Sequence, residues 1–195
     1  MYVNEKAKKG RQDRSLPKKD SAKAASSQTA EIGRLMWIPV FVSAALLLLI
    51  LRSNAAGNIR LGQYFTLAEL TNTNSGLPNY PGPTEVSNLQ YLVETVLDPL
   101  RGEVGPLLVT SGFRSSAVNA ATPGASNSSQ HMRGEAADVV PTSTSQSEAV
   151  AVLRTLPVDQ VITYDDSSHI HISARRGDNR GEFLTSIGGN YQWMG

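Results

Sequence analysis

The residues best suited to chemistry lie in two short segments, 129–138 and 169–171. The first reads Ser-Gln-His-Met-Arg-Gly-Glu-Ala-Ala-Asp, the second reads His-Ile-His, and together they hold every histidine of the chain. Catalytic zinc takes three protein ligands, among them imidazole nitrogens and carboxylate oxygens, and keeps a fourth position for water. His131 and Asp138, with His169 or His171, would supply that set. The chain has no cysteine, so thiolate ligands are excluded.

A turn can bring the two ligands of the first segment together. His131 and Asp138 are seven residues apart, which fits neither one helix face nor one strand face. Gly134 can adopt backbone conformations closed to other residues, so the chain can bend there and a strand at 135–140 can return Asp138 towards His131. The alternative is that Asp138 merely ends a strand.

The second segment leaves its ligand open. Side chains alternate along a strand, so His169 and His171 lie on the same face. Either histidine could therefore bind a metal, and the alternative is a plain polar strand face.

Helical and strand patterns around these segments predict an α+β fold, a small antiparallel sheet with packed helices. From 85 to 100, apolar residues recur at spacings of three and four, which predicts a buried helical face. Capping boxes start helices at Thr66 and Ser145, and Ser115 caps a short helix. Strands are expected at 107–110, 135–140, 158–164 and 170–174, and residues 72–83 are expected to be loop.

The N-terminal part is different in composition. Residues 1–34 carry nine Lys or Arg against four acids, whereas the chain after residue 51 carries nine Arg against thirteen acids. The tail has too few large apolar residues to form a core, so we expect disorder there. Residues 35–51 contain no charge and are just long enough for a transmembrane helix, with 52–63 as a linker to a domain at 64–195.

Because positive charge stays in the cytoplasm, we expect a single-pass membrane protein with residues 1–34 cytoplasmic and the domain periplasmic or extracellular. Two alternatives remain for residues 35–51. They could form a buried core helix, or belong to a signal peptide cleaved near the small residues 53–56.

Three motifs together resemble the peptidase M15 family of zinc D-Ala-D-Ala carboxypeptidases and phage murein endopeptidases. They are Ser-Gly-Phe-Arg-Ser at 111–115, Ser-x-His-x-x-Gly-x-Ala-x-Asp at 129–138, and His-Ile-His-Ile-Ser at 169–173. The start of the domain, at 64–70, is similar to the short phage-associated branch. The resemblance covers about residues 64–174 and implies a Hedgehog-like, DD-peptidase-like fold with one zinc ion per domain.

The resemblance implies a role for each matching residue. His131, Asp138 and His171 match the zinc ligands, and Arg114 matches the arginine that binds the substrate carbonyl or the developing oxyanion. Ser129 and His169 are expected to line the substrate pocket.

The general base departs from the family pattern. Many relatives carry an acid three residues before the last ligand, where this chain has Ser168. The short branch tends to carry its acid at the end of the preceding strand, so we expect Asp165 to be the base, with Asp166 as the alternative. The segment 165–168 could also be a plain hairpin turn.

The resemblance implies that the partners are peptide stems of peptidoglycan, bound outside the membrane, and not nucleic acid. Two other interpretations remain: a catalytically silent zinc-containing module that binds the cell wall or has a structural role, and a virion membrane protein of a phage. Arg175 and Arg176 could contact an anionic wall polymer or could simply be solvated.

Overall fold

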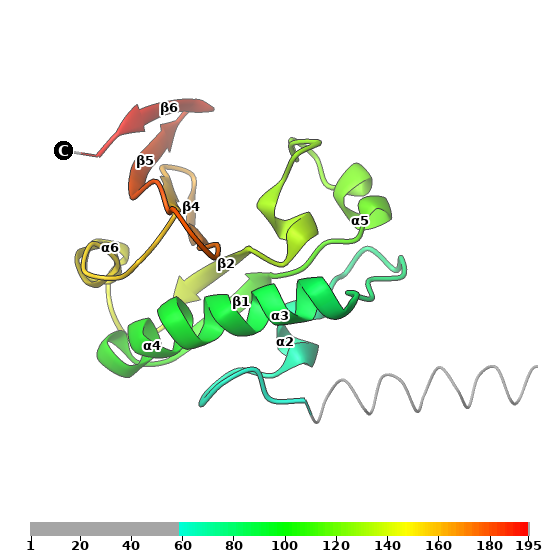
Figure 1. Cartoon of the computed structure of the whole chain (residues 1–195). Coiled ribbons are helices and arrows are strands. Elements are labelled where there is room, and N and C mark those ends of the chain that lie inside the picture. Colours follow the sequence, from blue (N-terminus) through cyan, green and yellow to red (C-terminus); the bar gives the residue numbers. More distant parts are fainter. Residues whose placement is uncertain (1–58, 195) are drawn as a thin grey trace, which may run out of the picture. The chain divides into compact units, whose positions relative to one another are not determined.

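The computed structural model describes residues 59–194, which are built around one six-stranded sheet with the strand order β1-β2-β4-β3-β5-β6 (Figure 1). The strands are β1 (Leu107–Ser111), β2 (Ala136–Pro141), β3 (Gln160–Tyr164), β4 (Ser167–Ser173), β5 (Glu182–Ile187) and β6 (Asn190–Trp193). Neighbouring strands are antiparallel except β3 and β5, which are parallel. The predicted α+β class is confirmed, but the sheet is not wholly antiparallel.

The predicted core helix is continuous, with one π-helical turn in its middle that is wider than an α-helical turn. It consists of α3 (Pro83–Leu92), the π-helical segment η1 (Val93–Leu97) and α4 (Asp98–Val104). Pro99 explains the widening, because proline has no N–H and its ring clashes with the carbonyl four residues earlier in a regular α-helix. In the π turn the N–H of Asp98 instead bonds to the carbonyl of Val93.

The short helices begin where their caps predicted. Thr66 caps α2 (Leu67–Thr71) and Ser145 caps α6 (Gln146–Leu153), each through a complete capping box. Ser115 accepts a hydrogen bond from Val118 N at the start of α5 (Ser116–Ala121). Polar groups at the helix starts are thus satisfied by side chains that the sequence places there.

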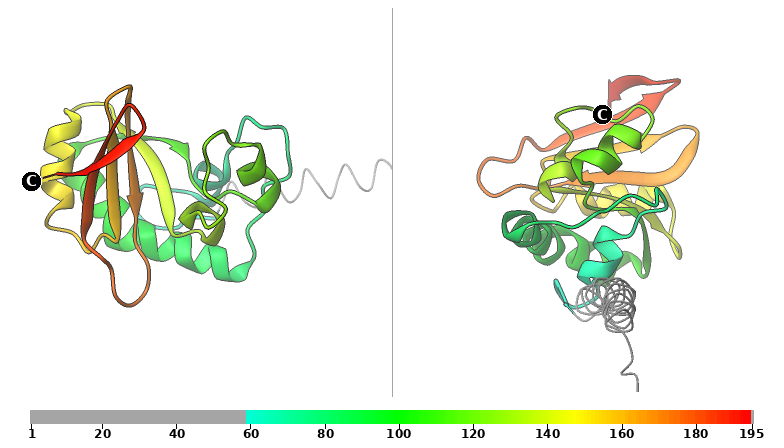
Figure 2. Two further views of the ribbon diagram at one scale, coloured as in Figure 1. Left: turned by 90° about the horizontal axis from the view of Figure 1, so that it is seen from above. Right: turned by 90° about the vertical axis from the view of Figure 1, so that its right-hand side faces the viewer.

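One face of the sheet packs in the hydrophobic core, and the other face is turned away from it. Ala137 and Val139 of β2 and Ile170 and Ile172 of β4 belong to the main hydrophobic cluster, together with buried residues of α3, α4 and α6. Helix α6 packs on β2, β3 and β4, as the further views in Figure 2 show. The alternate residues of β2 and β4 therefore point to the opposite face.

The last two strands, β5 and β6, were not predicted. Residues 182–193 form an antiparallel hairpin whose first strand pairs with β3. In β5 the buried apolar residues Phe183 and Leu184 are adjacent and do not alternate, and in β6 Tyr191 and Trp193 are exposed at 60% and 71%. No alternating pattern therefore marks the two strands in the sequence.

The predicted tail, the predicted membrane span at 35–51 and most of the linker lie outside the described residues. Within 59–194, none of the helices is both long and apolar enough to cross a membrane.

Candidate metal centre

Strand register brings Asp138 and His171 together. The two residues are direct partners in the antiparallel pair of β2 and β4, and their neighbours Ala137 and Ile172 face the core. Directly opposed residues on one face have Cβ atoms about 4.5–5.5 Å apart. His169, two residues before His171, lies beyond the pairs that β2 and β4 form, the last of which joins Val139 and Ile170. Register therefore selects His171 over His169 as the neighbour of Asp138.

His131 reaches the same point from a separate element, the 3₁₀ turn η2 (Gln130–Arg133). Its Nδ1 lies 2.7 Å from the carbonyl oxygen of Gly112. A carbonyl can only accept, so Nδ1 carries the proton and Nε2 presents its lone pair to the other two side chains. The ring is 3% exposed.

Two glycines make this placement possible. Gly134 ends η2 with φ +69°, and a Cβ there would lie 2.4 Å from the carbonyl oxygen of Glu85. A Cβ on Gly112 would lie 2.2 Å from the carbonyl oxygen of Leu70. The predicted turn at Gly134 is present, and close backbone approach as well as conformational freedom requires glycine there.

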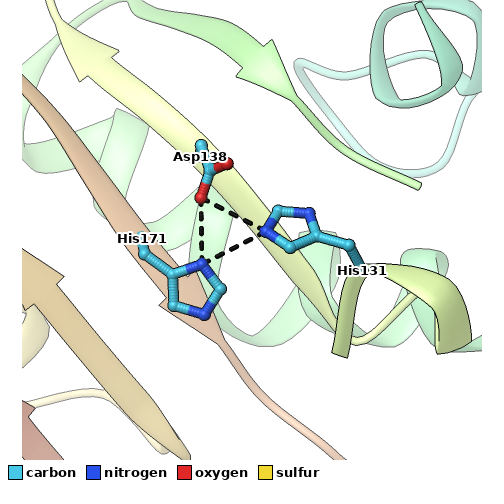
Figure 3. A group of neighbouring side chains, drawn as sticks. All are labelled: His131, Asp138 and His171. Atoms are coloured by element: carbon cyan, nitrogen blue, oxygen red, sulfur yellow. Dashed lines mark hydrogen bonds and ion pairs between the residues drawn. The ribbon is translucent and has the colours of Figure 1, made fainter. Parts of the chain in front are cut away.

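The three donor atoms form a triangle (Figure 3). His131 Nε2 lies 3.3 Å from Asp138 Oδ1, His171 Nδ1 lies 2.9 Å from the same oxygen, and the two nitrogens are 3.2 Å apart. Ligands bonded to zinc tetrahedrally at about 2.0–2.1 Å lie about 3.3 Å from one another. The donor set and its spacing therefore fit a zinc ion with an open fourth position.

The protonation states also suit metal binding. Burial by itself raises the pKa of Asp138, but the charges and hydrogen bonds of His131 and His171 outweigh it and hold that pKa well below its usual range. Burial lowers the pKa of His171, against the opposing effect of its hydrogen bond with Asp138. The shift at Asp138 favours the carboxylate and the shift at His171 favours the neutral imidazole, and these are the forms of the two side chains that bind metals.

Arg114 holds the second oxygen of the same carboxylate. Its Nη2 donates to Asp138 Oδ2 at 2.7 Å, and its Nε donates to Ser111 Oγ at 2.8 Å. Oδ1 is thereby left to face the two histidines. The arginine follows β1, whose last residue, Ser111, pairs with Asp138 across the sheet.

The triad lies at the wall of an open cavity of about 580 Å³, within the range of ligand-binding clefts. Its lining residues are mostly polar: Arg114, Gly124, Ala125, Ser126, Ser128, Ser129, Gln130, His131, Arg133, Asp138, Asp159, Gln160, Ile162, Tyr164, His171, Arg175, Arg180 and Tyr191. Burial, with a smaller effect of the Asp138 charge, raises the pKa of Tyr164 to about 12. Its hydroxyl therefore stays protonated at neutral pH and can donate a hydrogen bond.

Comparison with known proteins agrees with this geometry. A family model described as Peptidase M15 matches residues 63–173, more than half of the chain. The chain belongs to the peptidase M15 family. The match contains the whole donor triangle, and the family's zinc dependence agrees with the donor set. A search of curated proteins found no match.

Of the other residues expected from the M15 resemblance, some line the cavity and some do not. Ser129 precedes η2 and lines the cavity. His169 does not line it, but stacks on the lining residue Tyr164 with ring centroids 4.4 Å apart. Asp165 and Asp166 form the exposed turn between β3 and β4, outside the cavity lining. Asp165 Oδ2 accepts a hydrogen bond from Gly188 N at 3.2 Å.

Several residues of the M15 cavity were missed by sequence reasoning, notably Tyr164, Asp159 and Arg180. Tyr164 ends a predicted strand beside the hairpin turn, a position that could have suggested it. Asp159 lies just before β3, and its 1% exposure follows only from tertiary packing.

Proposed function

We propose that this protein is a zinc metallopeptidase that hydrolyses the peptide stems of peptidoglycan. The main support is the triangle of His131, Asp138 and His171 at the wall of the cavity, in a chain of the M15 family. Zinc bound there would supply a water of lowered pKa and polarise the scissile carbonyl.

The protein's own side chains would orient the substrate and stabilise charge. Arg114 lines the cavity with its Nη2 on Asp138, and its Nη1 has no partner within 59–194. That nitrogen can donate to the carbonyl oxygen as negative charge develops on it. The protonated hydroxyl of Tyr164, in the same cavity, can donate to the same oxygen or to the leaving group.

Asp165 remains the predicted general base, with Asp166 as the alternative. Its carboxylate would have to swing from Gly188 N towards the cavity when substrate binds, since hydrogen bonds of catalytic groups often form fully only in the substrate complex. An Asp165→Asn variant that keeps full turnover would remove this assignment.

The cellular setting is also part of the proposal. Residues 35–51 are proposed as a single membrane-spanning anchor, with the basic residues 1–34 in the cytoplasm and the peptidase domain outside, where peptidoglycan lies. A virion membrane is the alternative setting, in which the enzyme would open the cell wall during phage entry.

The direct test uses the full chain in detergent with purified murein. Release of free amines should require zinc, stop with a chelator and return when zinc is restored, and His131→Ala should abolish it. A matched control is His169→Ala, which removes the histidine that is not a proposed ligand and should keep bound zinc. Hydrolysis that is indifferent to both chelation and His131→Ala would refute the metallopeptidase assignment.

Two observations favour a second candidate, a zinc-containing module that binds the cell wall without cutting it. Neither Asp165 nor Asp166 lines the cavity, and Ser168 stands where many relatives carry an acid. Zinc and muropeptide binding without any turnover would support this module.

A further inference from the structure

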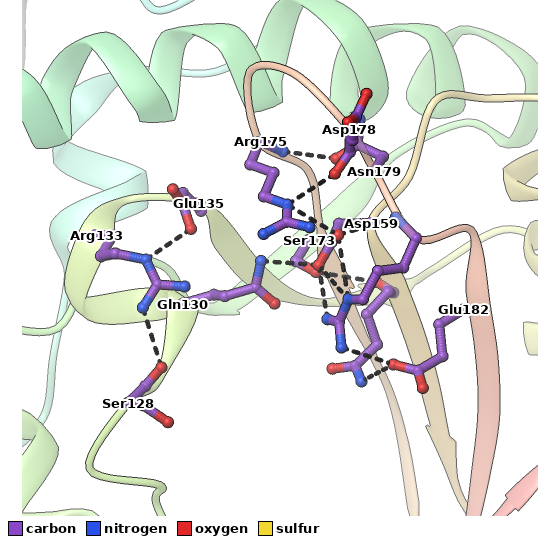
Figure 4. Close-up of polar contacts among 12 residues, drawn as sticks. Ser128, Gln130, Arg133, Glu135, Asp159, Ser173, Arg175, Asp178, Asn179 and Glu182 are labelled. Carbon is purple, nitrogen blue, oxygen red and sulfur yellow. Dashed lines mark hydrogen bonds and ion pairs between the residues drawn. The ribbon is translucent and has the colours of Figure 1, made fainter.

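A second cluster of charged residues lies in the same cavity as the metal triad, and the mechanism above does not use it. The loop between β4 and β5 carries Arg175 and Arg180, and both line the cavity together with Asp159. Figure 4 shows Arg175 directed towards this aspartate, and Arg180 also pairs with it.

Asp159 is an anchor for the cluster and not a free ligand. The residue is 1% exposed, and its Oδ2 accepts from Arg180 Nη2 at 2.6 Å and from Gln130 Nε2 at 3.1 Å. Its Oδ1 accepts from the backbone N of Arg180 at 3.0 Å and pairs with Arg175 Nε at 3.1 Å. A buried carboxylate with both oxygens engaged serves to hold the arginines in place.

The two arginines differ in how many guanidinium nitrogens are still available to bind a ligand. All three guanidinium nitrogens of Arg180 are engaged, Nε and Nη2 with Asp159 and Nη1 with Glu182 at 3.1 Å. Arg175 is engaged only at Nε, between Asp159 Oδ1 at 3.1 Å and the carbonyl oxygen of Asp178 at 3.0 Å. Its Nη1 and Nη2 have no partner in the described part of the chain.

This arrangement suits a carboxylate. The outer edge of a guanidinium presents two parallel N–H groups that match the two oxygens of a carboxylate, and a group already fixed at Nε loses less freedom when it binds. The charged residues that line the cavity are four arginines and two aspartates, so the lining favours an anionic ligand.

We propose that Arg175 forms a subsite that binds a carboxylate of the substrate peptide while the scissile bond lies at the metal triad. The substrate class is thereby an acidic peptide, one with a free side-chain, α- or terminal carboxylate. This inference rests on the proposed peptidase function, because it concerns the same cavity.

Arg176 provides a matched control in the same loop. Its guanidinium lies over the ring of Tyr91 at 4.8 Å and donates to Ser87 O at 3.3 Å, and it does not line the cavity. Arg176→Gln removes the same charge from the adjacent position, so an effect through the overall field of the protein would appear in both variants.

The test compares one synthetic stem peptide with derivatives in which each carboxylate in turn is converted to a carboxamide. For wild-type full chain, amidation of one carboxylate should raise KM about tenfold, as expected for loss of a charge-assisted bidentate contact, and leave kcat within about twofold. Arg175→Gln should raise KM for the free peptide by the same factor and abolish the discrimination. Arg175→Lys should restore it only in part, and Arg176→Gln should behave as wild type.

Equilibrium binding of the same peptides to zinc-free protein separates this inference from the proposed function. Discrimination that depends on Arg175, without hydrolysis of peptides or murein, would refute the peptidase and keep the subsite. Hydrolysis of murein with the same carboxylate preference in wild type and Arg175→Gln would refute the subsite and keep the peptidase. Wild-type protein that binds and cleaves every derivative equally would also overturn the subsite.

Discussion

Gly134→Ala should weaken zinc binding at the proposed site although no ligand is changed. The new Cβ would lie 2.4 Å from the carbonyl oxygen of Glu85, where ordinary contacts begin at 3.4 Å, so one backbone segment must move by about 1 Å. Gly134 follows η2 directly, and the donor triangle has edges of only 2.9–3.3 Å. A displacement of that size at His131 would leave it outside tetrahedral geometry, and zinc affinity should fall about 10- to 100-fold.

The cost in stability has two parts, and Gly76→Ala separates them. Both glycines have φ +69°, but a Cβ on Gly76 meets nothing within 4 Å. Each variant should lose about 1–2 kcal/mol for the left-handed backbone, and Gly134→Ala should lose about 1–3 kcal/mol more for the overlap. Urea unfolding of the metal-free proteins measures the two losses, and competition with a chromogenic chelator measures zinc affinity.

Equal destabilisation by the two alanines, with zinc affinity unchanged in Gly134→Ala, would refute this account of the turn. The close contact with α3 would then play no part in positioning His131.

Three further predictions concern Asp159, Tyr164 and the proposed general base. Asp159→Asn should destabilise the protein by about 2 kcal/mol at pH 7, because it removes the anion that Arg180 binds. Burial raises the pKa of Asp159, but the hydrogen bonds and charge of Arg180 lower it overall. The free energy of unfolding that wild type has in excess of Asp159→Asn is therefore complete above about pH 4 and should shrink as the pH falls below it. Urea unfolding of both proteins at pH 7, 5 and 3 tests this, and an excess that grows in acid would contradict it. Tyr164→Phe should lower kcat about tenfold and leave KM within about twofold, measured by steady-state hydrolysis, since the hydroxyl is expected to act on charge that develops in the transition state. Asp165→Asn should lower kcat by about 100-fold or more if this residue is the base, whereas Asp166→Asn should have little effect; the reverse order would exchange their roles.

Most of the scaffold around the site follows from local sequence. The helical apolar pattern of 85–100 and the capping boxes at Thr66 and Ser145 specify elements through contacts within a few residues. Those elements are present as predicted. The π turn before Pro99 was not predicted, because whether a proline breaks, kinks or widens a helix depends on the packing on both sides of it.

The local sequence does not decide whether His169 or His171 is the metal ligand. Alternation places both on one face and cannot rank them, since the strand that pairs with them is about thirty residues away in sequence. The pairing of Asp138 with His171 is a tertiary contact. It is set by the register in which the core residues of β2 and β4 align. The family resemblance selected the same histidine from motif position, by a route independent of the register.

The unpredicted hairpin of β5 and β6 matters for function because one of its residues lines the cavity that holds the triad. β5 pairs with β3 through its backbone and buries Phe183 and Leu184, and Tyr191 of β6 lines the cavity. The loop that leads into β5 carries Arg175 and Arg180. A metal site within β2, β4 and η2 thus requires only the matched part of the chain, 63–173. Arg175, the residue proposed to bind the substrate carboxylate, lies just beyond it. Substrate preference can therefore change in this C-terminal part while the metal site is kept.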